Sequence, residues 1–87
     1  MNTVQHVGFI NDADKERGAI LEVNGKRASA HRHCLGYKAP QYEKPILVWE
    51  CYLANDWNES NPLRFEAKTI KALVGKLEKH PYRLVKR

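Results

Sequence analysis

The 87-residue chain lacks an apolar run long enough to cross a bilayer. Its longest strongly apolar run covers only residues 45–49, whereas a membrane helix needs roughly 20 such residues. The first ten residues also lack both the basic start and the sustained apolar stretch of a secretory signal. We therefore expect no membrane partner and a cytoplasmic location.

Cysteine is scarce, and the motifs that carry catalytic or cofactor chemistry are missing. Two cysteines, Cys34 and Cys51, are too few for the disulfide framework of a small secreted protein, so we expect two reduced, buried thiols. The sequence contains no glycine-rich phosphate loop, no nucleophile elbow and no paired-cysteine zinc motif. The acidic run 11–16 departs from EF-hand spacing because Gly18 falls one position late. We therefore expect a non-enzymatic protein without a cofactor.

What is present is a globular composition with an uneven distribution of charge. Hydrophobic residues make up 43% of the chain and charged residues 29%, which is typical of one compact domain over residues 1–87. Residues 62–87 hold eight Lys and Arg against two acids, a net charge of +6, whereas residues 1–61 hold seven against eight, a net −1. A surplus confined to one segment marks one face for a polyanion or an acidic partner.

The first half of the chain predicts strands. Residues 3–10 are rich in β-formers, and the charged residues 11–18 that follow indicate a loop. Asn24 and Gly25 then lie between two β-forming runs, and both tolerate the positive φ that a two-residue type I′ hairpin requires. The resulting register places Leu21 opposite Ala28 on an apolar face.

The second half predicts further strands and one helix. Its expected elements are a loop over residues 34–44, a central strand covered on both faces over 45–53, a turn over 55–62 and a half-exposed strand over 63–68. Thr69 can cap a helix over residues 70–80, because apolar residues recur there at helical spacing. Pro81 should end that helix, and residues 82–85 can add a last strand.

The expected fold is therefore α+β: an antiparallel sheet of five to six strands, with one C-terminal amphipathic helix packed on one face. Such a sheet has a second face that another copy of the chain would bury, so a homodimer is one possible assembly.

Lysines of the predicted helix are the main candidates for a binding site. Lys68, Lys71, Lys76 and Lys79 fall opposite the apolar stripe, and Arg83, Lys86 and Arg87 continue the basic track. Lysines in such a row can follow a phosphate backbone, and the counterions they displace supply affinity. The competing interpretation is that an amphipathic helix simply needs a solvated face. The first interpretation predicts binding to nucleic acid, or to an acidic surface of a nucleic-acid-handling protein, with little base preference.

Aromatic residues in predicted loops support an alternative partner surface. Tyr37, Tyr42 and Trp57 belong to a residue class enriched at interface hot spots, whereas Trp49 and Phe65 fit strand alternations as packing residues. The alternative function is therefore a stoichiometric inhibitor of a larger enzyme, of the kind that phages and mobile elements encode. This comparison is one of function alone.

Two histidines suggest two further hypotheses. His31 and His33 point the same way on a strand, and with Cys34 and Cys51 they offer nitrogen and sulfur ligands for zinc. No second paired-ligand motif completes such a site, so we expect no metal. The same histidines, with a neighbouring Lys or Arg, could instead perform acid and base catalysis on RNA as in a small ribonuclease.

Overall fold

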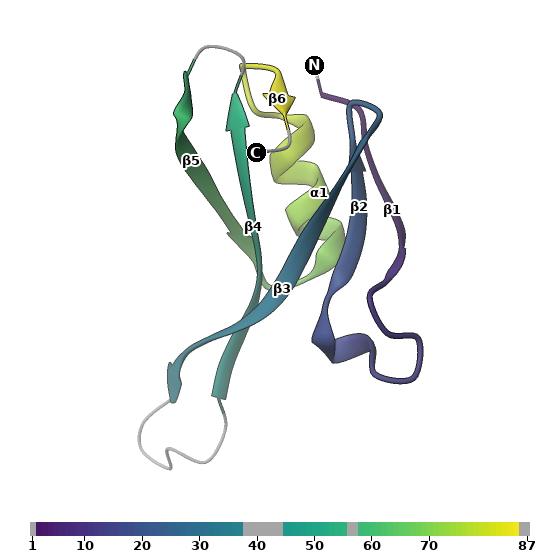
Figure 1. Cartoon of the computed structure of the whole chain (residues 1–87). Helices are drawn as coiled ribbons and strands as arrows, with labels where there is room; N and C mark the ends of the chain where they lie inside the picture. The colour runs from purple at the N-terminus through teal and green to yellow at the C-terminus, as the bar shows by residue number, and fades with distance from the viewer. Residues whose placement is uncertain (1, 38–44, 56–57, 86–87) are drawn as a thin grey trace.

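The computed structural model describes residues 2–37, 45–55 and 58–85. Its elements, in chain order, are β1 (Val4–Phe9), the 3-10 turn η1 (Lys15–Arg17), β2 (Ala19–Val23), β3 (Lys26–Tyr37), β4 (Pro45–Asn55), β5 (Asn58–Ala67), α1 (Ile70–Glu78) and β6 (Leu84–Val85). The strands form one antiparallel sheet in the order β1-β2-β3-β4-β5, and β6 pairs with the C-terminal end of β4 (Figure 1). The predicted α+β fold is confirmed.

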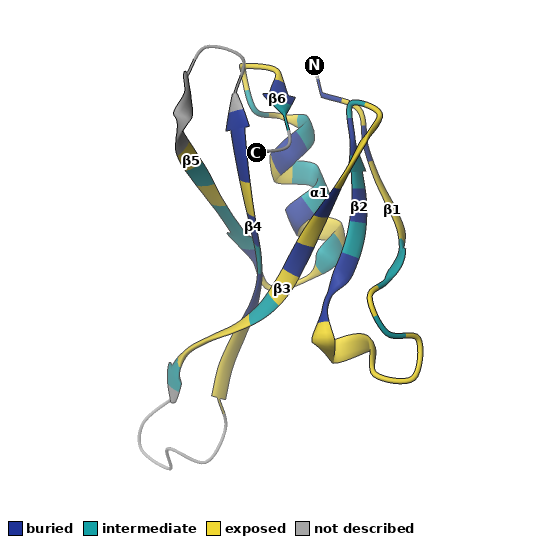
Figure 2. Cartoon of the chain, in the orientation of Figure 1, coloured by how far each residue is buried: buried dark blue, intermediate teal, exposed yellow. Residues whose placement is uncertain are grey.

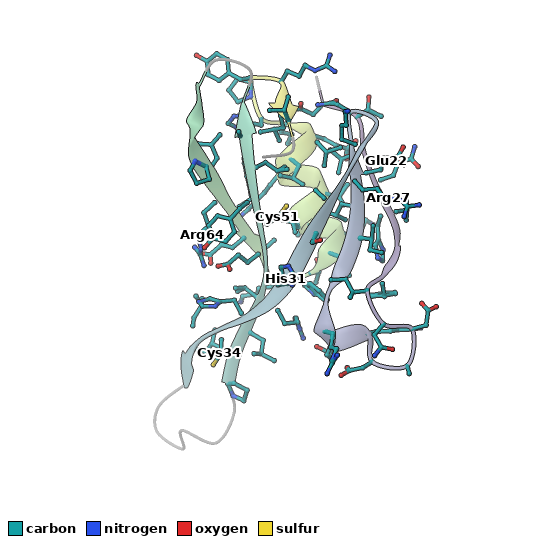
Figure 3. All side chains as sticks on the ribbon, in the orientation of Figure 1. Glu22, Arg27, His31, Cys34, Cys51 and Arg64 are labelled. Carbon is teal, nitrogen blue, oxygen red and sulfur yellow. The ribbon has the colours of Figure 1, made fainter. Side chains whose placement is uncertain are left out.

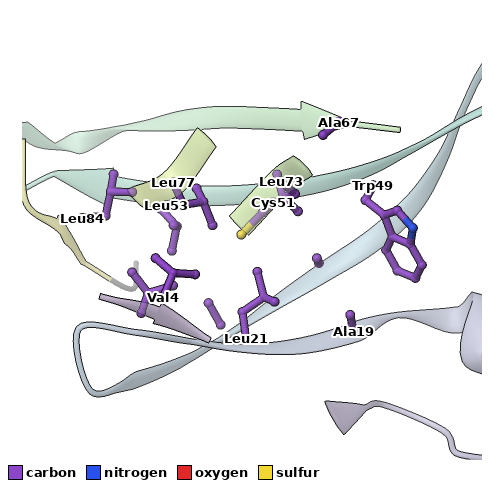
Figure 4. Packing of buried hydrophobic residues seen from close by; sticks show 13 residues of the cluster. Val4, Ala19, Leu21, Trp49, Cys51, Leu53, Ala67, Leu73, Leu77 and Leu84 are labelled. Atoms are coloured by element: carbon purple, nitrogen blue, oxygen red, sulfur yellow. The ribbon is translucent and has the colours of Figure 1, made fainter. Parts of the chain in front are cut away.

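The sheet curls around α1 instead of lying flat beneath it. In Figure 1 the helix stands between the β4 and β5 side and the β1 and β2 side, and it packs against β5, β1 and β4. Leu73 and Leu77 are fully buried and join Leu21, Cys51 and Leu53 in a single apolar cluster (Figure 4). Burying a leucine side chain contributes roughly 1.5–3 kcal/mol, so this cluster fixes the position of the helix.

The hairpin between β2 and β3 has the predicted turn and register. Asn24 and Gly25 have φ values of 50° and 84°, as a type I′ turn requires. Leu21 lies opposite Ala28, and both are buried on the side of the sheet that faces α1. The small alanine leaves room beneath the leucines of the core, as its place in the register predicted.

Asn2 ties the N-terminal end of the chain to residues 77–84 at one end of the sheet. Its buried carboxamide donates to the carbonyl oxygens of Leu77 (3.1 Å), His80 (3.3 Å) and Tyr82 (3.0 Å). The carboxamide oxygen accepts from the backbone N–H of Leu84 at 2.8 Å. Asn2 thereby adds a donor at the C-terminus of α1, where the Leu77 carbonyl also accepts from the His80 N–H at 3.3 Å.

Asn24 extends this hydrogen-bonded group, which we call the junction. Its side-chain Nδ2 donates to the Oδ1 of Asn2 and to the carbonyl of Leu84, both at 2.8 Å. Its Oδ1 accepts from the N–H of Thr3 at 2.9 Å, and its own N–H donates to the carbonyl of Thr3. The turn residue thus also holds β1 and β6 together.

At the other end of the sheet, β3 and β4 project beyond the core as a two-stranded ribbon. The described pairing of β3 with β2 stops at Ala30, and that of β5 with β4 stops at Trp49. Beyond these points β3 and β4 pair with each other as far as Tyr37 and Pro45. We call residues 33–37 and 45–48 the arm, and most of its described residues are exposed (Figure 2).

Three boundaries predicted from sequence are wrong, and pairing with β4 explains two of them. The loop predicted to begin at residue 34 begins after Tyr37, because residues 34–37 continue the ladder with β4. The turn predicted for residues 55–62 ends by Asn58, where β5 starts, and an edge strand tolerates the proline at position 62. The helix ends at Glu78, two residues before the predicted end.

Burial corrects two further expectations. The strand β4 is not covered on both faces throughout, since Ile46 and Leu47 lie in the arm and are 39% and 36% exposed. Cys51 is buried as predicted, but Cys34 is exposed because β3 carries it beyond the core. Both cysteines are free thiols.

Within the residues that the structure describes, no helix has both the length and the apolar composition needed to cross a membrane.

Candidate anion-binding surface

The cap at Thr69 fixes where the lysines of α1 point. The Thr69 hydroxyl accepts from the N–H of Ala72 at 3.1 Å, which starts the helix at Ile70 as predicted. With Leu73 and Leu77 fully buried, the opposite side of the helix is directed to solvent. Four exposed lysines lie at that side or just before it, and we call them the lysine face: Lys68, Lys71, Lys76 and Lys79.

The lysine face is long enough to meet several phosphates. At 1.5 Å per residue, Lys71 and Lys79 are about 12 Å apart along the helix axis. Phosphates of one DNA strand follow one another every 3.4 Å along the duplex, so this length matches between three and four nucleotide steps. At 100° per residue, Lys71, Lys76 and Lys79 fall within an arc of about 140°.

The four lysines have no carboxylate partner among the described residues, for which the ion pairs involve only arginines. Within the described residues, Lys76 is the one lysine of the four with a side-chain hydrogen bond, from its Nζ to the backbone carbonyl of Glu66 at 2.5 Å. That bond leaves the ammonium charge uncompensated. Lys71 lies in the first turn of α1, where no acid is present and a cation opposes the helix dipole. Its charge therefore does not stabilise the helix.

Two arginines of the sheet, Arg64 and Arg32, are in contrast paired with acids. Arg64 lies on the face opposite α1, with its Nε 2.7 Å from Glu50 Oε2 and its Nη2 2.7 Å from Glu66 Oε2 (Figure 3). The hydrogen bond to Glu50, followed by that to Glu66, raises the pKa of Arg64. Because Glu50 and Glu66 are opposite each other in the register, the guanidinium relieves their mutual repulsion.

Arg32 is similarly occupied at the base of the arm. Its Nε lies 2.6 Å from Glu16 Oε2, and its guanidinium lies 5.0 Å from the centre of the Trp49 ring. The ion pair links η1 to β3, while the stacking covers an aromatic ring that is 7% exposed. Trp49 is therefore a packing residue, as predicted. The guanidinium of Arg32 is held by these two contacts within the chain.

Of the remaining residues of the predicted basic track, the structure describes Arg83 and not Lys86 or Arg87. Arg83 is exposed in the segment between α1 and β6 and lines a hollow of about 250 Å³ with Asn2 and Asn24. Lys86 and Arg87 lie outside the described residues, so their part in the track stays a prediction.

The aromatic candidates are equally untested. Tyr42 and Trp57 lie outside the described residues, and of Tyr37 the structure describes the backbone at the end of β3. The described part of the arm does carry exposed apolar side chains, with Leu35 50%, Ile46 39% and Leu47 36% exposed. The sequence signal for Ile46 and Leu47 is the apolar run over residues 45–49, which predicts a strand covered on both faces, whereas Leu35 falls in the predicted loop.

The histidines and cysteines are not assembled into a metal site. Among the described residues, no three His, Cys, Asp or Glu side chains lie close enough to hold an ion. His31 and His33 are exposed on β3, opposite Glu50 and Val48 respectively. The ribonuclease hypothesis stays untested, and the nearby Arg32 is already paired with Glu16.

Sequence reasoning missed the junction, the Arg64 ion pairs and the arm. Asn2 gave no signal, because its partners lie up to 82 residues away in the chain. The pairing of Arg64 with Glu50 depends on the register between β4 and β5, which the sequence alone does not reveal.

Comparison with protein-family models, with curated proteins and with solved structures finds no match to this chain.

Proposed function

We propose that this protein is a non-enzymatic binding module that engages nucleic acid through the lysine face. The observation that carries the proposal is a difference in pairing: lysines of α1 are exposed without described carboxylate partners, whereas Arg32 and Arg64 of the sheet are ion-paired. Such lysines are available to neutralise phosphates, and the cations condensed on the nucleic acid would be released on binding.

The proposed contacts go to the backbone and not to base edges. Lysine presents a flexible point charge, whereas sequence readout depends on bidentate or shape-specific contacts in a groove. Binding should therefore vary little with base sequence. An acidic surface of a protein that handles nucleic acid would offer the same charges, and Lys86 and Arg87 would extend the contacts in either case.

Fluorescence anisotropy with a labelled single-stranded oligonucleotide and a labelled duplex tests the proposal. The double variant Lys71→Glu, Lys79→Glu should weaken binding at least roughly tenfold, since each substitution turns an attraction into a repulsion. The matched control is Lys26→Glu, Arg27→Glu in the exposed β2–β3 hairpin, which changes the net charge equally. Equal losses in the two double variants would mean that net charge, and not the lysine face, governs binding.

Salt dependence gives a second test. If all four lysines contact phosphate, the slope of log K against log salt should lie between about −2.8 and −3.6. The Lys71, Lys79 double variant should reduce that slope by about 2. A slope near zero in the unmodified protein would contradict the proposal.

A second candidate function is stoichiometric inhibition of a larger enzyme. It is favoured by three exposed apolar side chains on the arm, those of Leu35, Ile46 and Leu47. Tyr37, Tyr42 and Trp57 are the further residues assigned to this interface. Capture from the native host, repeated after nuclease treatment, distinguishes the candidates. A protein that the unmodified chain retains and the Leu35→Ser, Leu47→Ser variant does not retain supports the second candidate. Co-purified material that is lost after nuclease treatment supports the first proposal.

A further inference from the structure

An open groove of about 450 Å³ lies where the arm meets the helix. Its floor is aliphatic, formed by Leu35 and Val48 from the arm and by Ala67 and Ala72 from the end of β5 and the start of α1. The groove therefore joins the exposed apolar surface of the arm to the lysine face, two features that are far apart in sequence.

Two members of the lysine face, Lys68 and Lys76, stand at the rim of this groove. Lys76 is held there by its hydrogen bond to the carbonyl of Glu66. The carboxylate of Glu66, the acid among the lining residues, is paired with Arg64 at 2.7 Å. The rim therefore presents positive charge beside an apolar floor, and the complementary ligand combines an apolar group with carboxylates on either side.

This chemistry fits a protein segment better than a nucleic acid. Unpaired bases bind by stacking on aromatic or arginine planes, and the lining residues that the structure describes include neither. A sugar–phosphate backbone has no aliphatic side chain to fill the floor, whereas leucine or isoleucine does. A volume of about 450 Å³ lies within the 300–1,000 Å³ typical of pockets that bury a ligand.

We propose that the groove binds one apolar side chain from an acidic segment of a partner protein, with the flanking carboxylates on Lys68 and Lys76. This site goes beyond the proposed nucleic-acid interface but shares two of its lysines, so the two partners would compete. An apolar anchor surrounded by charged contacts is the usual arrangement of a small protein interface, with a hydrophobic centre and a polar rim.

Selection of random displayed peptides on the immobilised full chain tests this site. Selected peptides should carry a Leu, Ile or other apolar residue between Asp or Glu residues. Ala72→Gln places a longer, uncharged side chain in the groove and should weaken those peptides roughly tenfold or more. Ser29→Gln is the matched control, because it adds the same side chain at an exposed position of β3 outside the groove.

Two further measurements test the groove without relying on the Ala72→Gln variant. Backbone amide shifts in the unmodified protein should change at Ala67 and Ala72 when a selected peptide binds, independently of any variant. Lys76→Gln should weaken acidic peptides but not their Asn- and Gln-substituted counterparts. Failure to select peptides, or selected peptides that lack acids or ignore Ala72→Gln, would overturn the proposal.

Oligonucleotide binding is the last measurement of this experiment. If Ala72→Gln weakens oligonucleotide binding and leaves peptide binding intact, the groove belongs to the nucleic-acid interface and the protein-segment proposal is wrong. If peptides bind as expected but oligonucleotides do not bind the unmodified chain at all, the groove proposal holds and the proposed nucleic-acid function fails.

Discussion

The two ends of the sheet differ in the kind of side chain that they bury. At the junction, polar side chains are buried and their hydrogen bonds are made within the chain, with Asn2 only 4% exposed. At the arm, apolar side chains are exposed, and Leu35 is 50% accessible. The polar groups of the junction are thus paired within the chain, whereas the apolar side chains of the arm remain available to a partner.

This difference indicates which residues maintain the fold and which are free to serve a partner. Loss of a junction residue should unfold the protein without any effect specific to binding. Loss of an arm residue should alter binding without any large effect on stability. Variants at the two ends test that division, and the buried Cys51 thiol gives a measurement in the core between them; the three follow from the largest expected effect to the smallest.

Asn2→Leu should lower the free energy of unfolding by about 3 kcal/mol. The substitution keeps a similar volume but removes the hydrogen bonds to the Leu84 N–H and the Leu77 carbonyl. The buried Leu84 N–H is left unsatisfied, which costs about 1–3 kcal/mol, and loss of the bond to the Leu77 carbonyl, which keeps its bond from the His80 N–H, adds about 1 kcal/mol. Denaturant unfolding measures the change. Gln5→Leu is the control, since it replaces another carboxamide with leucine at an exposed site and should change stability by about 0.5 kcal/mol or less. Equal effects of the two variants would refute the role assigned to Asn2.

The buried Cys51 thiol makes stability depend on pH above neutrality. Burial raises its pKa from 9.0 to about 11, so the unfolded chain loses this proton first as the pH rises. Its contribution is therefore complete below pH 9 and is lost as the pH approaches 11. The loss amounts to about 2 kcal/mol.

The measurement is the difference in unfolding free energy between the unmodified chain and Cys51→Val, taken across this pH range. Subtracting the unfolding free energy of the variant removes the contributions of lysines and tyrosines, which ionise over the same pH range. A difference that stays constant from pH 9 to 11 would show that the thiol is not buried as described.

How much of the fold and of the candidate site the sequence could predict depends on how far apart in the chain the interacting residues lie. The turn at Asn24 and Gly25 and the helix start at Thr69 were predicted correctly, because a few neighbouring residues determine each. The exposure of the lysines was also predictable, since helical periodicity separates them from Leu73 and Leu77. Local patterns were sufficient in these cases.

Features that depend on contacts between distant segments were not predictable. Asn2 meets Leu84 across almost the whole chain, and Glu50 meets Glu66 and Arg64 only through the register of β4 with β5. The apolar residues of β4 looked like core, because the sequence does not show that β2 and β5 stop pairing before the arm begins. The arm and its groove follow from where that pairing ends.

The smallest expected effect on stability comes from the arm. The double variant Leu35→Ser, Leu47→Ser should change the free energy of unfolding by no more than about 0.5 kcal/mol per site, because both side chains already contact solvent. Leu53→Ser, at a fully buried position of the same sheet, should lose about 3 kcal/mol or more. A large loss in the arm variant would mean that the arm is covered.

Protein concentration then identifies what covers it. If a second copy buries the arm, the melting temperature of the unmodified chain should rise with concentration, and that of the arm variant should not. If melting is independent of concentration in both, the exposed leucines remain available to another protein. The comparison between the two ends of the sheet then stands.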